Sequence, residues 1–335
     1  MTLNSLGDMA QAFALSRRNT EIKSDIQRLN LELSSGQTTD ITRHLGGSYA
    51  RLTAVERDIR LNAAYGMTIA EADQFVTAVQ DRLEQISTLA TDFTADLLAA
   101  QASHDAVTRD ALTSEARMHF RTIVAALNSQ SAGRVMFGGE TTDRAALQDA
   151  DTILAALEAT VLGAADADEA IARIATWFDD PAGYDTVAYA GSGTPLGAFK
   201  MSDVASVAVD VRATDPAIKS ILKGFAIASF ATAPVLAFSS EEQGRMVRAA
   251  GESLLTDHGQ LVNLQATLGL AQQEVDRWSA YTASERVSFD MAKGALLNID
   301  PYRSATELEA AQFQLESLYT VTVRLSQLSL VNFLR

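Results

Sequence analysis

The side chains able to do acid–base chemistry or bind a metal are few in this sequence and widely spaced. The absence of cysteine excludes disulfides, thiolate catalysis and Cys-ligated zinc. Three of the four histidines, His44, His104 and His258, lie in or near polar segments with no carboxylate spacing that suggests a metal. His119 lies on an apolar helix face, where a single histidine without partner ligands is most often a core or interface residue.

Two polar clusters have plain structural explanations. Asp166, Asp168 and Glu169 could bind a cation, but they lack the glycine and the terminal glutamate of a calcium loop, so we interpret them as solvated surface. The segment 191–194 lacks the lysine of a phosphate loop and the flanks of a nucleophile elbow, and is predicted to be a turn. The sequence therefore predicts no catalytic residue, no cofactor, no metal site and no enzyme.

Composition indicates the class of protein. Of 335 residues, 47% are hydrophobic but only 7% aromatic, and alanine, leucine and small polar residues dominate, as in long helices packed side by side. The net charge of −15 argues against a nucleic-acid partner, because phosphate backbones attract Lys and Arg, and it disfavours an anionic membrane surface. Residues 1–14 lack the pattern of a cleavable signal peptide, and the longest apolar run, 225–238, is too short to cross a bilayer. We therefore expect any export to avoid the general secretory route.

The helices that would position a functional surface lie at the two ends of the chain. Residues 302–335 contain no Gly or Pro, and their apolar residues follow steps of three and four, which predicts a helix with one apolar stripe. This stripe includes Leu308, Leu315, Leu318, Val321, Leu325 and Leu328. A coiled-coil spacing near the other end consists of Leu15, Ile22, Ile26, Leu29 and Leu33, and stops at the glycine cap Gly36. We expect these two helices to pair and to form an assembly interface.

Two long helices are predicted between these ends. In the first, 49 to about 102, two seven-residue series run in parallel: Ile69, Val76, Leu83, Ala90 and Leu97, and Ala72, Val79, Ile86, Phe93 and Ala100. The second begins after 239 and carries Val247, Leu254, Leu261, Leu268, Val275, Thr282, Phe289 and Leu296. Series of this length indicate helices packed along their whole length. A shorter helix with Leu112, Ala116, Ile123 and Leu127 follows the first, and Asp300-Pro301 is predicted to cap and begin the last.

The middle of the chain differs in composition from the rest. It holds all proline except Pro301, and its charge is mostly acidic. We expect one or two short helices in 147–178, a turn at 179–183, strands at 186–189, 198–201 and 204–211, and a helix beginning at Asp215-Pro216. The fold is therefore predicted to be mainly α: a long antiparallel helical rod with paired terminal helices and a small α+β outer domain inserted in the middle. The predicted domains are 1–46 with 300–335, 47–140 with 240–299, and 141–239.

Four stretches carry a family resemblance: the helix end Leu29–Gly36, the segment Arg134–Gly139, the stretch Gln260–Gln265 and the tail from Asp300 to Leu330. They resemble the flagellin-like axial proteins of the bacterial flagellum, most of all hook-associated protein 3, the hook–filament junction protein. The resemblance covers roughly the first 60 and the last 100 residues. Flagellins proper tend to have a basic, Asn- and Asp-rich loop where this chain has Gln37–Ile41, and often a Pro-Gln near the C-terminus, which this chain lacks. Both departures favour the junction protein.

The resemblance implies a secreted structural component of the flagellum that links the hook-side junction protein to the flagellin filament. It also implies assembly with copies of itself in a helical array, export through the flagellar type III apparatus, and an export chaperone that shields the C-terminal helix. Two alternatives stay open from the sequence: a flagellin that forms the filament itself, and an unrelated cytosolic helical coiled-coil protein.

Overall fold

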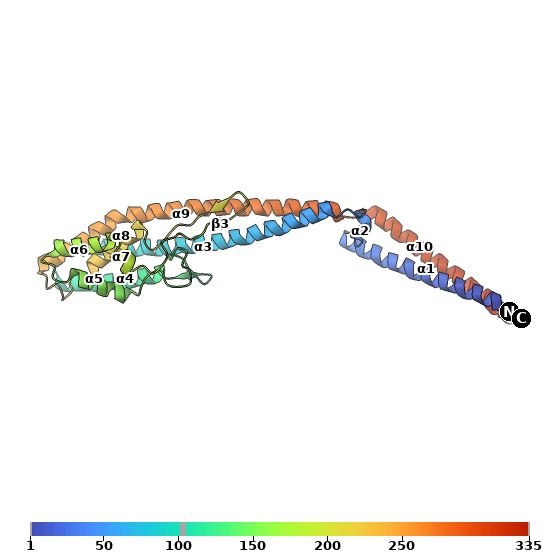
Figure 1. The fold of residues 1–335 in the computed structure, drawn as a ribbon, viewed down its shortest axis with the longest axis horizontal. Helices are drawn as coiled ribbons and strands as arrows, with labels where there is room; N and C mark the ends of the chain where they lie inside the picture. The colour runs from blue at the N-terminus through green and yellow to red at the C-terminus, as the bar shows by residue number, and fades with distance from the viewer. Residues whose placement is uncertain (1, 101–104, 334–335) are drawn as a thin grey trace. The chain divides into compact units, whose positions relative to one another are not determined.

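The computed structural model describes residues 2–100 and 105–333, and helices dominate it (Figure 1). The chain forms two compact units, which we name the terminal unit (Met1–Ala63 and Ser284–Arg335) and the central unit (Ala64–Ala283). The boundary passes through the two longest helices, α3 (Ala50–Ala100) and α9 (Ser240–Leu297), so each of these helices contributes residues to both units.

The heptad series of the two long helices form the core, as predicted. Both series of α3 are buried from Ile69 to Leu97, and only Ala100 at the helix end is half-buried. In α9 the series is buried from Val247 to Thr282. Its last two members, Phe289 and Leu296, are half-buried, and the neighbouring Leu297 is buried instead. Packing of apolar side chains along the whole helix is what stabilises such lengths in water.

The two long helices run antiparallel. In the central unit, hydrogen bonds join the helices, among them those of Thr77 with Gln272 at 3.5 Å, Gln80 with the Gln265 carbonyl at 3.3 Å, and Ser87 with His258 at 2.9 Å. Residue numbers rise along α3 from one contact to the next while they fall along α9. The terminal unit continues the same order, with Asn62 bonded to Glu285 at 3.3 Å and Glu56 paired with Lys293 at 3.3 Å. The register is thus held by polar pairs that flank the apolar seam.

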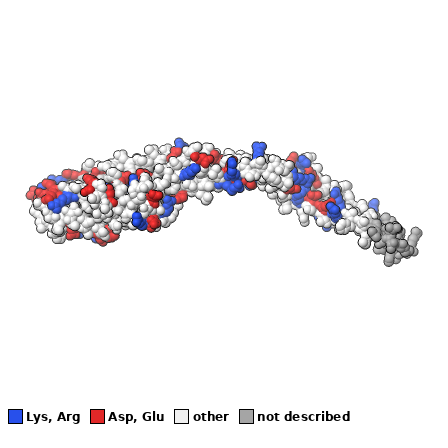
Figure 2. Space-filling view, in the orientation of Figure 1, with Lys and Arg blue, Asp and Glu red and all other residues white. Residues whose placement is uncertain are grey.

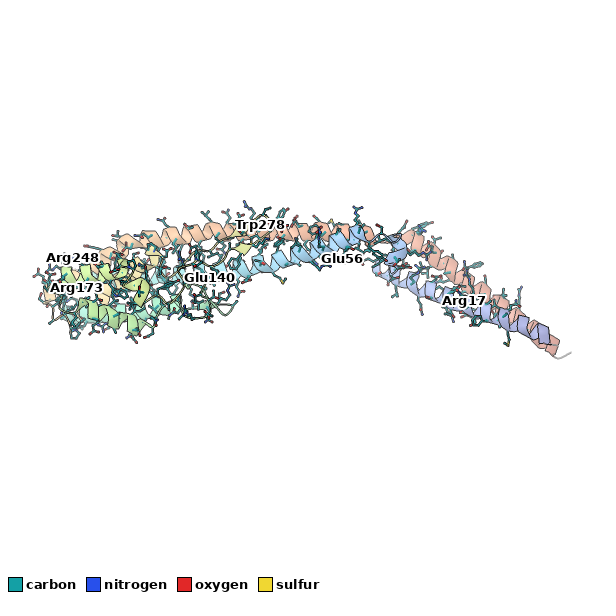
Figure 3. All side chains as sticks on the ribbon, viewed as in Figure 1. Arg17, Glu56, Glu140, Arg173, Arg248 and Trp278 are labelled. Carbon is teal, nitrogen blue, oxygen red and sulfur yellow. The ribbon has the colours of Figure 1, made fainter. Side chains whose placement is uncertain are left out.

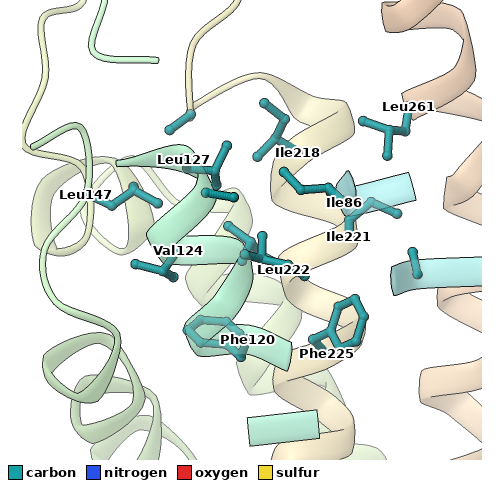
Figure 4. Close-up of a cluster of buried hydrophobic side chains, with 14 of the residues drawn as sticks. Ile86, Phe120, Val124, Leu127, Leu147, Ile218, Ile221, Leu222, Phe225 and Leu261 are labelled. Carbon is teal, nitrogen blue, oxygen red and sulfur yellow. The ribbon is translucent and has the colours of Figure 1, made fainter. Parts of the chain in front are cut away.

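Within the central unit, the inserted segment packs against α4 (Ala106–Leu127), mainly through its own helix α8 (Pro216–Ser229). Asp215 caps α8 by accepting from the Ala217 amide at 2.9 Å, and Pro216 stands at its first position, as predicted. Phe225 of α8 stacks on Phe93 of α3 with ring centroids 5.2 Å apart. Figure 4 shows this core, where α4, α8 and Ile86 of α3 meet Leu261 of α9. The insert and the long helices therefore share one hydrophobic core.

Two short helices complete the insert, α5 (Ala150–Val161) and α6 (Ala167–Asp179), followed by the predicted turn. The strand expected at 186–189 is wrong, because this stretch lies in the helical turn α7 (Tyr184–Val187), and Tyr189 makes only an isolated bridge to Leu147. Tyr184 explains the difference. Its buried ring stacks on Phe178 at 5.3 Å and its hydroxyl donates to the Ala213 carbonyl at 2.9 Å, so tertiary packing overrides the β-preference of Thr186 and Val187.

The strands of the described residues are short. A hairpin joins β1 (Gln130–Ser131) to β2 (Arg134–Val135), and a second ladder joins β3 (Phe199–Lys200) to β4 (Ser206–Val207). The predicted strand 204–211 pairs only at β4, although Val207, Val209 and Val211 are buried in alternation with exposed neighbours. The alternation of apolar and polar residues thus reflects the alternate burial of an extended segment, which pairs with another strand only at Ser206–Val207.

The terminal unit consists of α1 (Thr2–Ser35), the short α2 (Ile41–His44), α10 (Pro301–Phe333) and the adjoining ends of α3 and α9. Helices α1 and α10 lie side by side, with both chain ends at the same end of the pair (Figure 1). Gly36 ends α1 at a φ of +72°, a left-handed conformation that glycine adopts without strain. Asp300 caps α10 by accepting from the amides of Tyr302 and Arg303 at 3.0 and 3.3 Å, as predicted.

The fold class predicted from the sequence is confirmed: the chain is mainly α, with paired terminal helices, an antiparallel long helix pair and a small α+β insert. The three-part domain division stays a prediction, since the two compact units divide the chain within α3 and α9. Within residues 2–100 and 105–333, no helix is long and apolar enough to cross a membrane.

Candidate assembly interface

The seam between α1 and α10 is narrow. Ile22 and Leu29 are buried in it, Leu15 and Ile26 are half-buried, and Lys23 lies over the ring of Tyr319 with its nitrogen 5.8 Å from the ring centre. A hydrogen bond to Lys23 lowers the pKa of Tyr319 and a second one to Asn19 acts in the same direction, while burial opposes them. These contacts hold α10 to α1 along one stripe, because two helices alone can cover only one face of each other.

The predicted α10 stripe is only half-covered by that seam. Leu308, Leu315 and Leu318 are half-buried, and Val321 is exposed. The side chains of Leu325 and Leu328 lie outside the described ones. On α1, Leu33 is exposed, because the helix turns Glu32 inward at this point instead. The structure therefore brings Ile22 and Leu29 fully together with the C-terminal helix and leaves Leu33 and Val321 facing outward.

Large apolar side chains also lie outside the seam on both helices. Phe13 is 73% exposed and Phe313 is 70% exposed, and Met9, Tyr302 and Val323 are exposed as well. Exposed apolar surface of this density on a helix pair is typical of a surface that another protein covers. Burying one such phenylalanine removes roughly 150–250 Å² of largely apolar surface from water.

Charged residues on the terminal helix pair gather near the connectors to α2 and α9, as the blue and red groups in Figure 2 show. Ion pairs within α1 join Arg17 to Glu21 at 3.1 Å and Arg28 to Asp25 at 3.2 Å; Arg17 is labelled in Figure 3. Farther along α10, residues 312–333 carry only two charged side chains, Glu316 and Arg324. The half of the pair near the chain ends is therefore apolar and weakly charged, which suits burial against a partner.

The connectors that follow α1 and α9 are tied to each other by backbone hydrogen bonds. The Thr38 amide donates to the Leu297 carbonyl at 2.9 Å, and the Ile299 amide donates to the Gly36 carbonyl at 3.1 Å. Gln37 and Asn298 form an isolated antiparallel bridge. Since α1 and α10 both begin or end at these connectors, the ties fix where the two helices start their pairing.

Glu32 makes several of the polar contacts that hold the connector after α1. One of its carboxylate oxygens accepts from the Thr39 amide at 3.0 Å, from the Thr39 hydroxyl at 3.1 Å and from the Thr38 hydroxyl at 3.3 Å, while the other accepts from Arg28 at 2.9 Å. Burial acts to raise the pKa of Glu32, but the hydrogen bonds from Thr39 and Thr38 and the charge of Arg28 outweigh it, so the pKa lies below its ordinary value. A charged, buried Glu32 therefore holds the connector against the end of α1.

A cleft of about 470 Å³ opens beside Glu32. Charges of both signs line it, from Arg28, Glu32, Asp40, Arg43, Arg303 and Glu307. We interpret the cleft as the space between α1, α2 and the start of α10.

Glu32, Thr38 and Thr39 are not among the residues predicted from the sequence. The sequence does contain a hint of the role of Glu32, because this residue follows Leu29 by three positions and so lies on the face of the helix that carries the apolar stripe. A carboxylate at a stripe position indicates either solvent at that point or a buried polar network.

Two of the four histidines, His119 and His258, contact neighbouring side chains of the central unit. His119 packs edge-to-face against the stacked rings of Phe93 and Phe225, with centroids 5.4 and 5.9 Å away, and its Nε2 lies 3.4 Å from a Glu115 oxygen. His258 bonds Ser87 and Thr91, whereas His104 lies outside the described residues. Across residues 2–100 and 105–333, no group of three His, Asp or Glu is placed to hold a metal.

The acidic cluster at the start of α6 acts as a helix cap. The N-cap Asp166 accepts from the Glu169 amide at 2.8 Å, and Glu169 accepts from the amide of Ala165, the residue before the cap, at 2.8 Å. Asp168 pairs with Arg245 of α9 at 3.2 Å. Each carboxylate thus has a protein partner.

Comparison with known proteins identifies the C-terminal part of the chain. Residues 256–334 match the model of the bacterial flagellin C-terminal helical region. This segment includes most of α9, from Thr256 onward, and all of α10. No curated protein sequence matches the chain.

Two solved structures share the fold. A flagellar hook-associated protein of Vibrio parahaemolyticus is 14% identical with a TM-score of 0.50, covering 73% of this chain and 95% of that protein. FlgL of Bacillus cereus is 12% identical with a TM-score of 0.53, covering 72% of this chain and all of that one. At these identities the likeness establishes the helical fold of flagellar axial proteins.

Proposed function

We propose that this chain, which carries a flagellin C-terminal helical region on the fold of flagellar hook-associated proteins, is the hook–filament junction protein of a bacterial flagellum. Its role is mechanical rather than catalytic: copies of the chain join a hook-side junction protein on one side to the flagellin filament on the other. The observation that carries the proposal is the α1–α10 pair, whose narrow seam leaves Phe13, Phe313 and Val323 uncovered at the chain ends.

Two paired helices can bury only part of each other's surface. A pair of α-helices covers one stripe on each partner, and most stability of such helices comes from packing of the apolar face. In the α1–α10 pair, only Ile22, Leu29, Glu32 and Ser304 are buried among the described side chains, and just two of these four are apolar. Neighbouring copies that cover the remaining apolar side chains would complete the packing in a heterologous array, which need not close into a ring.

The remaining parts of the proposal concern delivery and location. The chain is exported by the flagellar type III apparatus and works in the extracellular flagellum, with flagellin and the hook-side junction protein as its partners. An export chaperone binds α10 beforehand, since the uncovered apolar side chains of this helix would otherwise be exposed in the cytoplasm.

A filament flagellin is the second candidate, because the matched family model describes the C-terminal region of flagellins. The two functions differ in what the purified chain does alone. A flagellin polymerises into micrometre filaments, whereas a junction protein stays mostly monomeric until a hook end is supplied. Free polymerisation of the purified chain would therefore favour the second candidate.

The test is electron microscopy of cells whose chain lacks residues 302–335. We expect hooks without attached filaments and flagellin lost to the medium, because the truncated chain keeps its central unit but has no α10. A finer variant is Phe313→Ser, which removes one exposed ring. It should also reduce filament attachment while leaving the thermal unfolding of the free protein unchanged.

The matched control is Val204→Ser, which alters an even more exposed apolar side chain in the central unit. It should leave attachment unchanged. Normal filaments on cells with the 302–335 deletion would refute the junction role, and equal attachment defects in Phe313→Ser and Val204→Ser would remove the argument from the terminal helices.

A further inference from the structure

A second apolar stripe lies on the outer face of α9, away from the core. It consists of Leu255, Gly259, Val262, Ala266 and Leu270, at steps of four, three, four and four residues, which place them on one helix face. All five are exposed, with Leu255 at 61%, Val262 at 44% and Leu270 at 67%. A Cβ built on Gly259 would meet open space.

The core side of the same stretch faces α3. Leu261 and Leu268 are buried, and Leu261 points into the core of Figure 4 beside Ile86 and Ile218. His258 and Gln265 bond α3. The outer stripe therefore has no part in holding the central unit together, and none of the described elements covers it.

Charge is absent from this surface. Residues 258–273 contain no Lys, Arg, Asp or Glu, in a chain that is 21% charged. Two other runs of similar length, 186–199 and 224–240, lie mostly in an irregular segment and in the buried end of α8 with its following turn. Beyond the uncharged stretch the charges resume with Glu274 and Arg277, just before Trp278 (Figure 3).

We propose that this outer face of α9, from Leu255 to Leu270, is a lateral packing surface for a second copy of the chain. The proposal rests on the function proposed above, in which many copies stand side by side. Each copy carries a net charge of −15, so two copies repel each other wherever charged surfaces approach. An uncharged apolar stripe is the surface on which they can meet without that repulsion, and Gly259 and Ala266 allow a neighbouring helix to approach closely.

The size of the stripe decides what kind of contact it is. Fifteen steps of about 1.5 Å give a length of about 23 Å, and with a width of about 10 Å the stripe offers roughly 230 Å². A stable free complex buries about 800 Å² on each partner. The stripe is too small to hold a free partner by itself. It fits a copy that other contacts, such as those of the terminal helices, already hold in place.

The test is photo-crosslinking in cells with the full-length chain, using a benzophenone amino acid at position 266 and, as a control, at position 204. We expect position 266 to give a crosslinked product of two copies of the chain in assembled flagella, and position 204 to give much less. In parallel, Ala266→Asp, which places a charge in the stripe, should increase filament loss under shear several-fold relative to Val204→Asp.

The outcomes separate this inference from the junction role. A product of position 266 with a different protein, or no product of two copies, would overturn the lateral surface, as would equal shear resistance in the two aspartate variants. If the 302–335 deletion removes filaments while position 266 gives no self-product, only the lateral surface fails. If that deletion leaves filaments attached but the self-product persists, the surface stands and the junction role fails. Circular dichroism of Ala266→Asp checks that the exposed substitution leaves the fold intact.

Discussion

Glu32 shows how a single residue sets the geometry of the terminal unit. A buried carboxylate is costly unless hydrogen bonds and a positive charge compensate it, and here Thr38, Thr39 and Arg28 supply both. The amide of Thr39 and the carboxylate of Glu32 satisfy each other at the point where α1 ends and the connector begins. The neighbouring backbone tie of Thr38 to Leu297 then joins this point to the end of α9.

The substitution Glu32→Gln should loosen the connector. The amide side chain keeps one acceptor but loses the charge, and a hydrogen bond to a charged group contributes about 1.5–3 kcal/mol. We expect native-state hydrogen exchange at the Thr39 amide to accelerate by a corresponding factor of roughly 10 to 100. Glu21→Gln, an exposed glutamate on the same helix, is the control and should leave Thr39 unaffected.

The pH dependence of this contact follows from the lowered pKa of Glu32. Because the folded pKa lies below the unfolded one, the stabilisation is present above the ordinary glutamate pKa of about 4.3 and is lost as pH falls through the folded value. Protection of the Thr39 amide in the wild type should therefore approach that of Glu32→Gln at acidic pH. A gap between the two proteins that stays constant from neutral to acidic pH would contradict the assigned role of the charge.

At the scale of elements, the α1–α10 pair depends on very few buried side chains. Leu29 is buried in the seam, whereas Leu31, two residues later, is 59% exposed. Truncation of a buried leucine to alanine usually costs about 2–5 kcal/mol, and a seam this narrow relaxes easily, so we expect the lower end of that range for Leu29→Ala.

Leu31→Ala is the matched control for that variant, since it removes the same atoms from the exposed side of the same helix. Hydrogen exchange of the α1 amides is the suitable measurement, because global melting also reports the larger central unit. Equal exchange rates in Leu29→Ala and Leu31→Ala would mean that the seam does not stabilise α1.

Helices proved predictable from sequence wherever a long periodic pattern coincided with burial. The heptads of α3 and α9, the caps Gly36 and Asp300 and the start of α8 at Pro216 all follow from local rules. The strand expected at 186–189 failed, because a distant contact, the burial of Tyr184 against Phe178 and Ala213, decides the backbone there. The spacing of apolar residues places Leu33 in the seam, but in the structure Leu33 is exposed and the neighbouring Glu32 is buried instead.

At the scale of the whole molecule, the acidic charge and the apolar surfaces act in opposite directions on self-association. The net charge of −15 keeps free copies apart, and both surfaces proposed for assembly are poor in charge. Raising the salt concentration from about 0.01 M to about 1 M shortens the screening length from about 30 Å to about 3 Å, and should therefore strengthen association between copies.

Sedimentation velocity over that range of salt measures the effect. The variant lacking residues 302–335 should show a smaller response, because it has lost the apolar side chains of α10. Weaker association at high salt would instead indicate that ion pairs hold the copies together, which would contradict the assignment of apolar contact surfaces.

The antiparallel order of α3 and α9 also constrains the time course of folding. Thr77 and Gln272 meet across a loop of almost 200 residues, and α1 cannot pair until α10, far later in the sequence, has been synthesised. Closing a loop ten times longer costs about 2 kcal/mol more in chain entropy, which slows such contacts relative to local ones. The α5–α6 region is therefore expected to fold first, the long helices to pair next, and α1 and α10 to pair last. If the chain is exported unfolded through a pore, as proposed above, α1 and α10 stay apart until both have emerged.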